Sequence, residues 1–187
     1  MDQQNIDKII SNYLSKNIKF SDESIFSVKL SLLDTLGCIY NASTYEDPMR
    51  FATRNVYGAN TNPFKVLEDI KSSKEVARYF SILTRWFDYN DTFLAKEWAH
   101  PSDNIGTAFA YFINHKEKNI SQFLQSIIQM YEIQGSLALG TSLNKKGYDH
   151  VFYVKLASGA VYSSLLSDKN TESISRTVTV SYTHLRA

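Results

Sequence analysis

Apolar residues recur along most of the chain at the three- and four-residue spacing of an amphipathic helix. Polar breaks separate these runs, and nothing repeats at a period of roughly 20 to 50 residues, so a solenoid is not indicated. The pattern therefore predicts an all-α domain, built as a bundle of helices. The predicted helices span approximately residues 6–14, 24–40, 72–87, 101–113, 119–143 and 151–166.

The helix predicted from Asn119 has the clearest start, because Asn119 and Gln122 match a capping box. Residues 41–63 are less regular, with turn signals on both sides of a possible short helix over about residues 47–57. Residues 177–182, Thr-Val-Thr-Val-Ser-Tyr, alternate like a strand but have no second strand to pair with. We therefore expect a truncated or artificial end to the chain.

Size and charge narrow the class of protein. The 187 residues (21.4 kDa) suffice for one domain with a hydrophobic core and are too few for two large ones. Twenty basic and nineteen acidic residues leave a formal charge of +1 without a long run of either sign, which argues against nucleic-acid binding. The first residues do not form a signal peptide, and no apolar run approaches the length of a membrane span. We expect a cytoplasmic protein with no membrane or nucleic-acid partner.

The cysteine and histidine content gives no sign of a metal site. The single cysteine, Cys38, lies in an apolar helical run and is interpreted as a core residue. One cysteine allows neither a disulfide framework nor zinc-ligand spacing. The histidines, at positions 100, 115, 150 and 184, show no pairing four residues apart, so we expect no metal.

One stretch does not follow an amphipathic pattern. Residues 85–106 read Arg-Trp-Phe-Asp-Tyr-Asn-Asp-Thr-Phe-Leu-Ala-Lys-Glu-Trp-Ala-His-Pro-Ser-Asp-Asn-Ile-Gly. Acids, amides, hydroxyls and a histidine are set among large aromatic rings, a mixture typical of a binding pocket. The same rings could instead form ordinary core and the acids a solvated helix end, and spacing alone does not decide between the two.

Candidate acid–base groups lie in this stretch. If the preceding helix runs through it, Asp88, Asp91 and Thr92 share one helix face, and like charges held close raise the pKa of at least one carboxyl group. His100 precedes Pro101 at a predicted helix entrance, where an imidazole can exchange a proton and backbone amides suit an anionic group. The hypothesis is acid–base chemistry on a substrate that bears a carboxylate.

Four motifs together resemble the MmgE/PrpD family. The resemblance covers residues 1–178 and leaves 179–187 as a non-matching tail, and the motif that begins at Glu97 is more similar to the methylcitrate branch than to the cis-aconitate decarboxylase branch. The motifs are Leu33-Asp-Thr-Leu-Gly-Cys38, Arg85-Trp-Phe-Asp-Tyr-Asn-Asp-Thr92, Glu97-Trp-Ala-His-Pro-Ser-Asp-Asn-Ile-Gly106, and Tyr131-Glu-Ile-Gln-Gly135 with Gly147-Tyr-Asp-His-Val151.

The resemblance implies part of the family's N-terminal helical domain, truncated before the rest of that domain and its α+β lid domain. It implies removal of water from 2-methylcitrate, a small tricarboxylate, to give 2-methyl-cis-aconitate in propionate breakdown. It also implies no cofactor, in particular no iron–sulfur cluster, and a homodimer for the full-length parent. Family members carry later cationic groups, including a lysine, so this fragment is expected to be inactive alone.

The resemblance also assigns site residues. It implies that His100 is the principal proton-transferring group, with Asp88 and Thr92 orienting it or binding the leaving hydroxyl. It implies that His150 binds a substrate carboxylate or transfers a second proton, although on the residues alone His150 reads as a surface-loop histidine. The implied catalytic residues are Asp88, Thr92, His100 and His150, and the implied substrate-binding residues are Asp91 and Ser102.

Two alternatives stay open. The same groups could decarboxylate cis-aconitate or isomerise a related polycarboxylate, and the width of the pocket would distinguish these reactions. The chain could also be a non-catalytic helical interaction module that keeps the family's residues without turnover.

Overall fold

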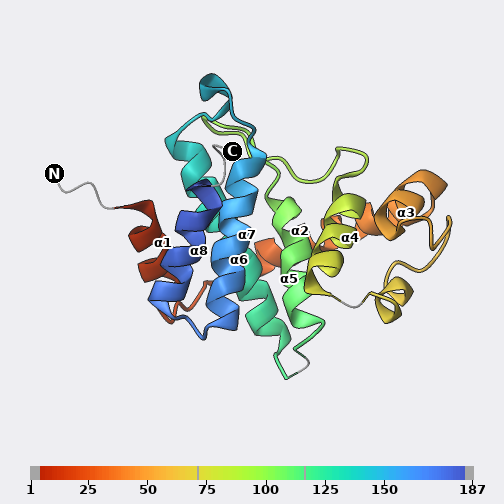
Figure 1. Cartoon of the computed structure of the whole chain (residues 1–187), viewed down its shortest axis with the longest axis horizontal. Coiled ribbons are helices and arrows are strands. Elements are labelled where there is room, and N and C mark those ends of the chain that lie inside the picture. Colours follow the sequence, from red (N-terminus) through yellow and green to blue (C-terminus); the bar gives the residue numbers. More distant parts are fainter. Residues whose placement is uncertain (1–4, 71, 116, 184–187) are drawn as a thin grey trace.

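The computed structural model describes residues 5–70, 72–115 and 117–183, which form a bundle of eight α-helices (Figure 1). Within these ranges, β-structure is limited to an isolated bridge between Phe93 and Ala99. The all-α prediction is therefore confirmed. The helices are α1 (Ile6–Leu14), α2 (Asp22–Ser43), α3 (Glu46–Thr53), α4 (Ser73–Arg85), α5 (Ile105–Phe112), α6 (Ile120–Gly140), α7 (Val151–Leu166) and α8 (Thr171–Thr183), with short 3₁₀ turns η1 (Lys65–Glu68), η2 (Pro101–Asn104) and η3 (Asn144–Lys146).

Buried apolar side chains form two main clusters that meet at α5. The larger cluster joins α1, α2, α5, α6, α7 and α8, and the smaller joins α2, α3, α4 and α5. Phe109 packs against both, with its ring centroid 4.5 Å from that of Phe80 and 5.4 Å from that of Phe123. Each such side chain contributes about 1.5–3 kcal/mol when fully buried, so α5 holds the two halves of the bundle together.

Side chains at the helix starts satisfy backbone amides that lack a partner within the helix. Ser21 accepts a hydrogen bond from the Ser24 amide (3.1 Å), which caps α2. The predicted capping box of α6 is confirmed, because Asn119 and Gln122 each accept a bond from the other's backbone amide. Such caps contribute about 1 kcal/mol each. The helix ends at Gly140, a little before the predicted end.

Two predicted helices end earlier than the apolar pattern indicated. The short helix predicted over residues 47–57 is present as α3, but it ends at Thr53, before Arg54 and Asn55 adopt left-handed conformations (φ 56° and 69°). Helix α4 ends at Arg85, so it does not continue through residues 86–100.

Residues 177–182, whose sequence alternates like a strand, belong to α8, a helix that the apolar pattern did not predict. Ile174, Val178 and Ser181 recur at helical spacing and are buried, and α8 packs against α1 and α7. Burial of this face outweighs the β-propensity of alternating Thr and Val. His184 lies outside the described residues.

Three further properties of the described ranges concern the cysteine, membrane-spanning helices and metal ligands. Cys38 is buried in α2 and is free, as expected of a core residue. None of the helices there has both the length and the apolar character needed to cross a membrane. No group of three or more His, Cys, Asp or Glu side chains in these ranges could hold a metal ion.

Gly106 lies where α4 and α5 approach each other closely. A Cβ atom at this position would lie 2.8 Å from the carbonyl oxygen of Ala77 and 3.0 Å from the amide nitrogen of Ser81. Both are backbone atoms of α4, which cannot rotate away. The close approach of the two helices therefore requires glycine here.

We expect Gly106→Ala to lower the free energy of unfolding by about 1–3 kcal/mol, because the added methyl group forces α4 and α5 apart. The matched control is Gly37→Ala in α2, where nothing lies within 4 Å of the added atom. Alanine there should stabilise by up to about 1 kcal/mol through its higher helix propensity. Urea unfolding measures both, and stabilisation by Gly106→Ala would contradict the close packing.

Candidate active site

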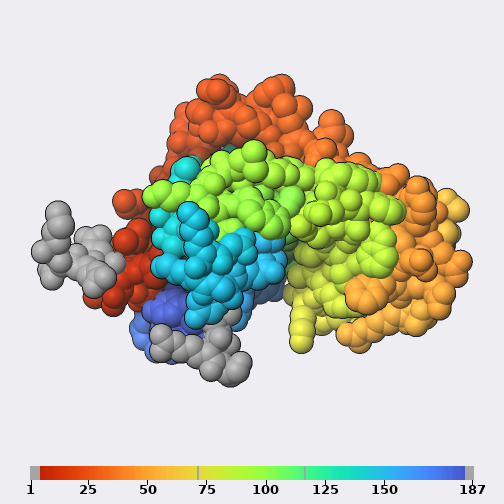
Figure 2. All heavy atoms as spheres, turned by 90° about the horizontal axis from the view of Figure 1, so that it is seen from above, coloured from red at the N-terminus to blue at the C-terminus, as the bar shows by residue number. Residues whose placement is uncertain are grey.

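The candidate site lies at one end of the bundle, where two loops meet. Residues 86–100 leave α4 and cross this end before η2, and residues 141–150 join α6 to α7 (Figure 1). Figure 2 looks down on this end and shows the green atoms of the first loop beside the light-blue atoms of the second. Side chains far apart in the sequence therefore meet here.

The first loop starts with a sharp turn at Asp88, which has a left-handed backbone (φ 59°). Asp tolerates this conformation better than most residues. Its exposed carboxylate pairs with the guanidinium group of Arg85. The prediction that Asp88, Asp91 and Thr92 share a helix face is therefore wrong, because the helix ends before all three.

His100 is buried and fixed in orientation. Its Nδ1 donates a hydrogen bond to the backbone carbonyl of Asp91 (2.8 Å), so the neutral ring carries its proton on Nδ1. Its Nε2 lies 3.9 Å from Oδ1 of Asp88, close enough for an ion pair when the ring is protonated. The loop is closed around it by two backbone hydrogen bonds between Phe93 and Ala99 (2.8 and 3.0 Å). The structure thus brings Asp88 and His100 together.

His150 also packs against the Trp98 indole, and this indole and the two imidazoles form a triangle of rings. The His150 ring centroid is 3.9 Å from that of Trp98, while the His100 ring lies 5.5 Å from the indole, and the two imidazoles are 6.0 Å apart. Nδ1 of His150 is 3.1 Å from the Asp149 carboxylate. Nε2 is buried without a hydrogen-bond partner in the described part of the chain.

Burial lowers the pKa of His150 below 6.5, and the nearby Asp149 only partly opposes this. The ring is therefore neutral near pH 7. With its proton on Nδ1 toward Asp149, it presents Nε2 as an acceptor for a ligand hydroxyl group.

A buried hydrogen-bond network lies beneath the two loops. The Asn90 amide donates to Ser102 Oγ (2.7 Å) and to the Asp103 carboxylate (3.2 Å), and Arg85 donates to the Asn90 oxygen (3.2 Å). Burial raises the pKa of Asp103 to about 6, although Arg85 and His100 hold it down. Asp103 is thus the carboxyl group of this site whose pKa is raised. The sequence analysis did not select it as a site residue.

The remaining predicted site residues differ in their surroundings. Asp91 accepts a hydrogen bond from the Ser102 amide (2.9 Å), so both residues shape the start of η2. Thr92 is exposed, and its side chain forms no hydrogen bond with other described residues. The hydroxyl group of Tyr131 is buried near Asp91 and Ser31, and burial raises its pKa. Ser102 and Asp91 therefore have structural partners in addition to any contact with a ligand.

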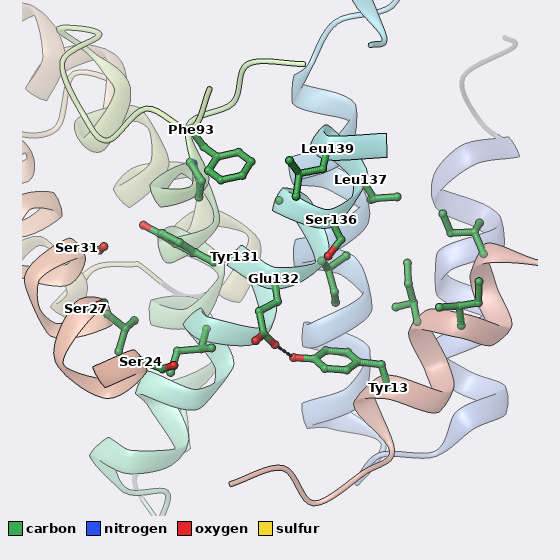
Figure 3. A pocket seen from close by; sticks show the side chains of 18 of the residues that line it. Tyr13, Ser24, Ser27, Ser31, Phe93, Tyr131, Glu132, Ser136, Leu137 and Leu139 are labelled. Atoms are coloured by element: carbon green, nitrogen blue, oxygen red, sulfur yellow. Dashed lines mark hydrogen bonds between the residues drawn. The ribbon is translucent and has the colours of Figure 1, made fainter. Parts of the chain in front are cut away.

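A largely apolar groove of about 870 Å³ lies beside the cluster, between α1, α2 and α6 (Figure 3). Phe93 and Pro101 are part of its lining, and the Tyr131 side chain points from α6 toward Ser31 on α2. Tyr13 and Glu132 hydrogen-bond across it. The groove does not include Asp88 or either histidine, so the polar cluster lies next to the groove and not within it.

Several contacts in this site could not be found from sequence spacing. Arg85, Asn90, Trp98 and Asp103 belong to the unusual stretch over residues 85–106, and their mixed polar and aromatic character was the available signal. His115, by contrast, donates to the Tyr111 carbonyl (2.7 Å) and stacks on that ring, as expected of a structural histidine.

Two histidines contact one indole, and a carboxylate faces one of the two imidazoles. Such a site on a helical scaffold is suited to proton transfer. The chain matches the MmgE/PrpD N-terminal domain over residues 9–184, and it belongs to this family.

Curated relatives carry names that agree with this assignment. A probable 2-methylcitrate dehydratase of Saccharomyces cerevisiae is 34% identical over 183 residues, which cover 88% of this chain and 36% of that protein. The 2-methylcitrate dehydratase of Escherichia coli K12 is 38% identical over 72% of this chain and 30% of that protein. An alkylcitrate dehydratase of Talaromyces stipitatus is 30% identical over 95% of this chain and 41% of that protein. The chain therefore spans about a third of the length of the first two relatives.

The raised pKa of Asp103 predicts a pH-dependent stability. Because the carboxyl group titrates at about 6 in the fold against 3.8 in its usual state, the folded chain holds the extra proton between these values. The free energy of unfolding should then fall as pH rises from about 4 to about 6, by at most about 3 kcal/mol from this group. Asp103→Asn should remove this contribution in urea unfolding measured across that range.

Asp34→Asn, at an exposed position of α2, is the matched control and should keep the wild-type slope. His150 contributes the opposite slope near pH 6.5, because its pKa is lowered, and both variants retain that part. A wild-type slope in Asp103→Asn would show that the carboxyl group is not protonated in this range.

Proposed function

We propose that this chain is the N-terminal part of a hydro-lyase that removes water from 2-methylcitrate. Family membership and the names of the relatives support a dehydratase role. The observation that carries the proposal is the pair of imidazoles 6.0 Å apart, each with its Nδ1 engaged; the Nε2 of His150 has no hydrogen-bond partner among the described residues, and the Nε2 of His100 faces Asp88 at 3.9 Å.

The reaction requires removal of a weakly acidic proton next to a carboxylate and departure of a hydroxyl group. His100 suits the first task, because its Nε2 can take a proton while Nδ1 stays bonded to the Asp91 carbonyl. Asp88, on the Nε2 side, stabilises the imidazolium ion that forms. The proton moves from the substrate carbon to Nε2, and its bonding electrons form the new double bond as the hydroxyl group departs as hydroxide; the hydroxide then takes the proton from the imidazolium ion and leaves as water, which restores the neutral ring.

His150 and Thr92 are our candidates for the departing hydroxyl group. The His150 Nε2 can accept a hydrogen bond from that hydroxyl and orient it, and the exposed Thr92 hydroxyl is free to donate to it. Asp91 and Ser102 are proposed to line the substrate site at the start of η2, where they already bond to each other.

A tricarboxylate needs more positive charge than this cluster supplies. Arg85 is the cation that the described part of the chain places in the cluster, and it is already paired with Asp88 and lies 3.9 Å from Asp103. Electrostatic stabilisation of a developing anion requires fixed positive groups around it. We therefore propose that the chain alone is inactive and that turnover needs the remaining length of its relatives, as a homodimer.

The exact substrate and the location stay predictions. The name of a relative, alkylcitrate dehydratase, supports an alkyl-substituted citrate as the proposed substrate class, while decarboxylation or isomerisation by the same groups is the second candidate. A cytoplasmic location is our expectation, although a relative from Yarrowia lipolytica is named as mitochondrial.

We expect a full-length protein carrying this domain to convert 2-methylcitrate to a product whose conjugated double bond absorbs in the ultraviolet. His100→Gln should lower kcat by roughly 10²- to 10⁴-fold, because the proton acceptor is lost. Asp88→Asn should lower it less, since it removes only the partner of the imidazolium ion.

His115→Gln is the matched control, because this histidine packs on Tyr111 away from the cluster, and it should keep the parent's rate. Full activity in His100→Gln and Asp88→Asn would reject the roles proposed for these residues, and no turnover by the full-length parent would favour the non-catalytic interaction module instead.

A further inference from the structure

Glu97 joins the two loops of the site although its side chain is only 1% exposed. Oε1 accepts a hydrogen bond from the Asn144 side chain (2.6 Å), and Oε2 accepts from the Asn144 amide (2.8 Å) and from Ser142 Oγ (3.2 Å). The Glu97 backbone amide donates to the carbonyl of Ala138 (3.0 Å). One residue of the first loop thus makes four hydrogen bonds to the end of α6 and the loop that follows it.

The carboxylate is held as an anion by neutral donors. Burial is the largest influence and by itself raises the pKa of Glu97, but the hydrogen bonds from Asn144 and Ser142 outweigh it and the pKa is lowered. Ion pairs between described residues do not include Glu97. An ionised carboxylate is buried only where donors satisfy it, so the position of the first loop is tied to that of Asn144.

Trp98 follows Glu97 directly, and its indole contacts the rings of both His100 and His150, which come from different loops. The Phe93–Ala99 backbone pairing fixes the loop on one side of Trp98, and the Glu97 bonds fix it on the other. The separation of the two imidazoles therefore depends on how firmly the loops are joined.

We propose that Glu97 is a positioning residue, whose carboxylate locks the loop of residues 93–100 to that of residues 141–147 and so holds Trp98 against both His100 and His150. Both carboxylate oxygens of Glu97 are already bound by donors of the second loop, so its side chain acts through the loops and not on a substrate. Its importance for catalysis rests on the proposed dehydration, but the geometry it imposes can be measured in this chain without substrate.

The test truncates the side chain on each side of the hydrogen-bonded link between Glu97 and Asn144. Glu97→Ala removes both acceptors, and Asn144→Ala removes one donor while the carboxylate keeps its bonds to Ser142 and the backbone amide. Glu97→Gln is the conservative variant, because the Asn144 amide can turn over and accept from the new donor. Glu132→Ala is the matched control, an exposed Glu that bonds to Tyr13 in the groove.

The measurement is NMR of the imidazole and indole rings in the chain as it stands. We expect Glu97→Ala and Asn144→Ala to lose the nuclear Overhauser contacts between Trp98 and His150, together with the ring-current shift that the indole imposes on the His150 protons. The His150 titration midpoint should rise in Asn144→Ala, which keeps the Glu97 charge, because the ring becomes less buried; in Glu97→Ala the loss of that charge, which raises the pKa of His150, opposes the rise. Glu97→Gln should keep the ring contacts and the ring-current shift with a lower His150 midpoint, and Glu132→Ala should keep the parent spectrum in all three respects.

In the double variant Glu97→Ala/Asn144→Ala, the changes should be no larger than the greater single change, because both substitutions break one link. If Glu97→Ala does not fold, Asn144→Ala tests the same link with most of the bonds retained. Truncation variants that melt at a lower temperature but keep the ring contacts and the His150 midpoint would overturn the inference and leave Glu97 a purely structural residue. Lost ring contacts together with no turnover of 2-methylcitrate by the full-length parent would instead uphold the link and reject the proposed reaction.

Discussion

The site depends on one constraint: a long loop without regular structure must satisfy its backbone and buried polar groups if it is to hold a fixed shape. Residues 86–100 do so through the Phe93–Ala99 pairing, the bond from His100 to the Asp91 carbonyl, and the buried Glu97 carboxylate. Each of these bonds also places a side chain of the cluster. The same interactions that keep the loop ordered therefore set the positions of the side chains in the cluster.

The helical bundle supplies the fixed points to which this loop is attached. Helix α5 packs into both apolar clusters through Phe109, so the residues that precede it in η2 are held at a defined place. Helix α6 supplies the second attachment, because Ala138 near its end accepts a bond from the loop. Polar groups at the end of the bundle thus rest on a core whose two clusters are joined through α2 and α5.

Much of the fold could be predicted from the sequence, because helices and caps depend on neighbouring residues. Apolar spacing predicted most helices, and the capping residue Asn119 indicated the start of α6. Helix α8 was missed because burial of Ile174 and Val178 outweighs local strand propensity. The left-handed turn at Asp88 was also missed, since spacing does not reveal where a helix ends without a glycine or proline. Family motifs pointed to the two histidines, but not to contacts such as the one between Glu97 and residue 144, which are 47 positions apart.

The bond from His100 Nδ1 to a backbone carbonyl has a further effect on how the ring handles a proton. A carbonyl oxygen accepts in the same way from a neutral ring and from a charged one, so this bond persists in both states. Gaining or losing a proton at Nε2 therefore needs no ring flip and no rearrangement of the surrounding loop. The fixed ring can therefore exchange a proton at Nε2 with little reorganisation of its surroundings.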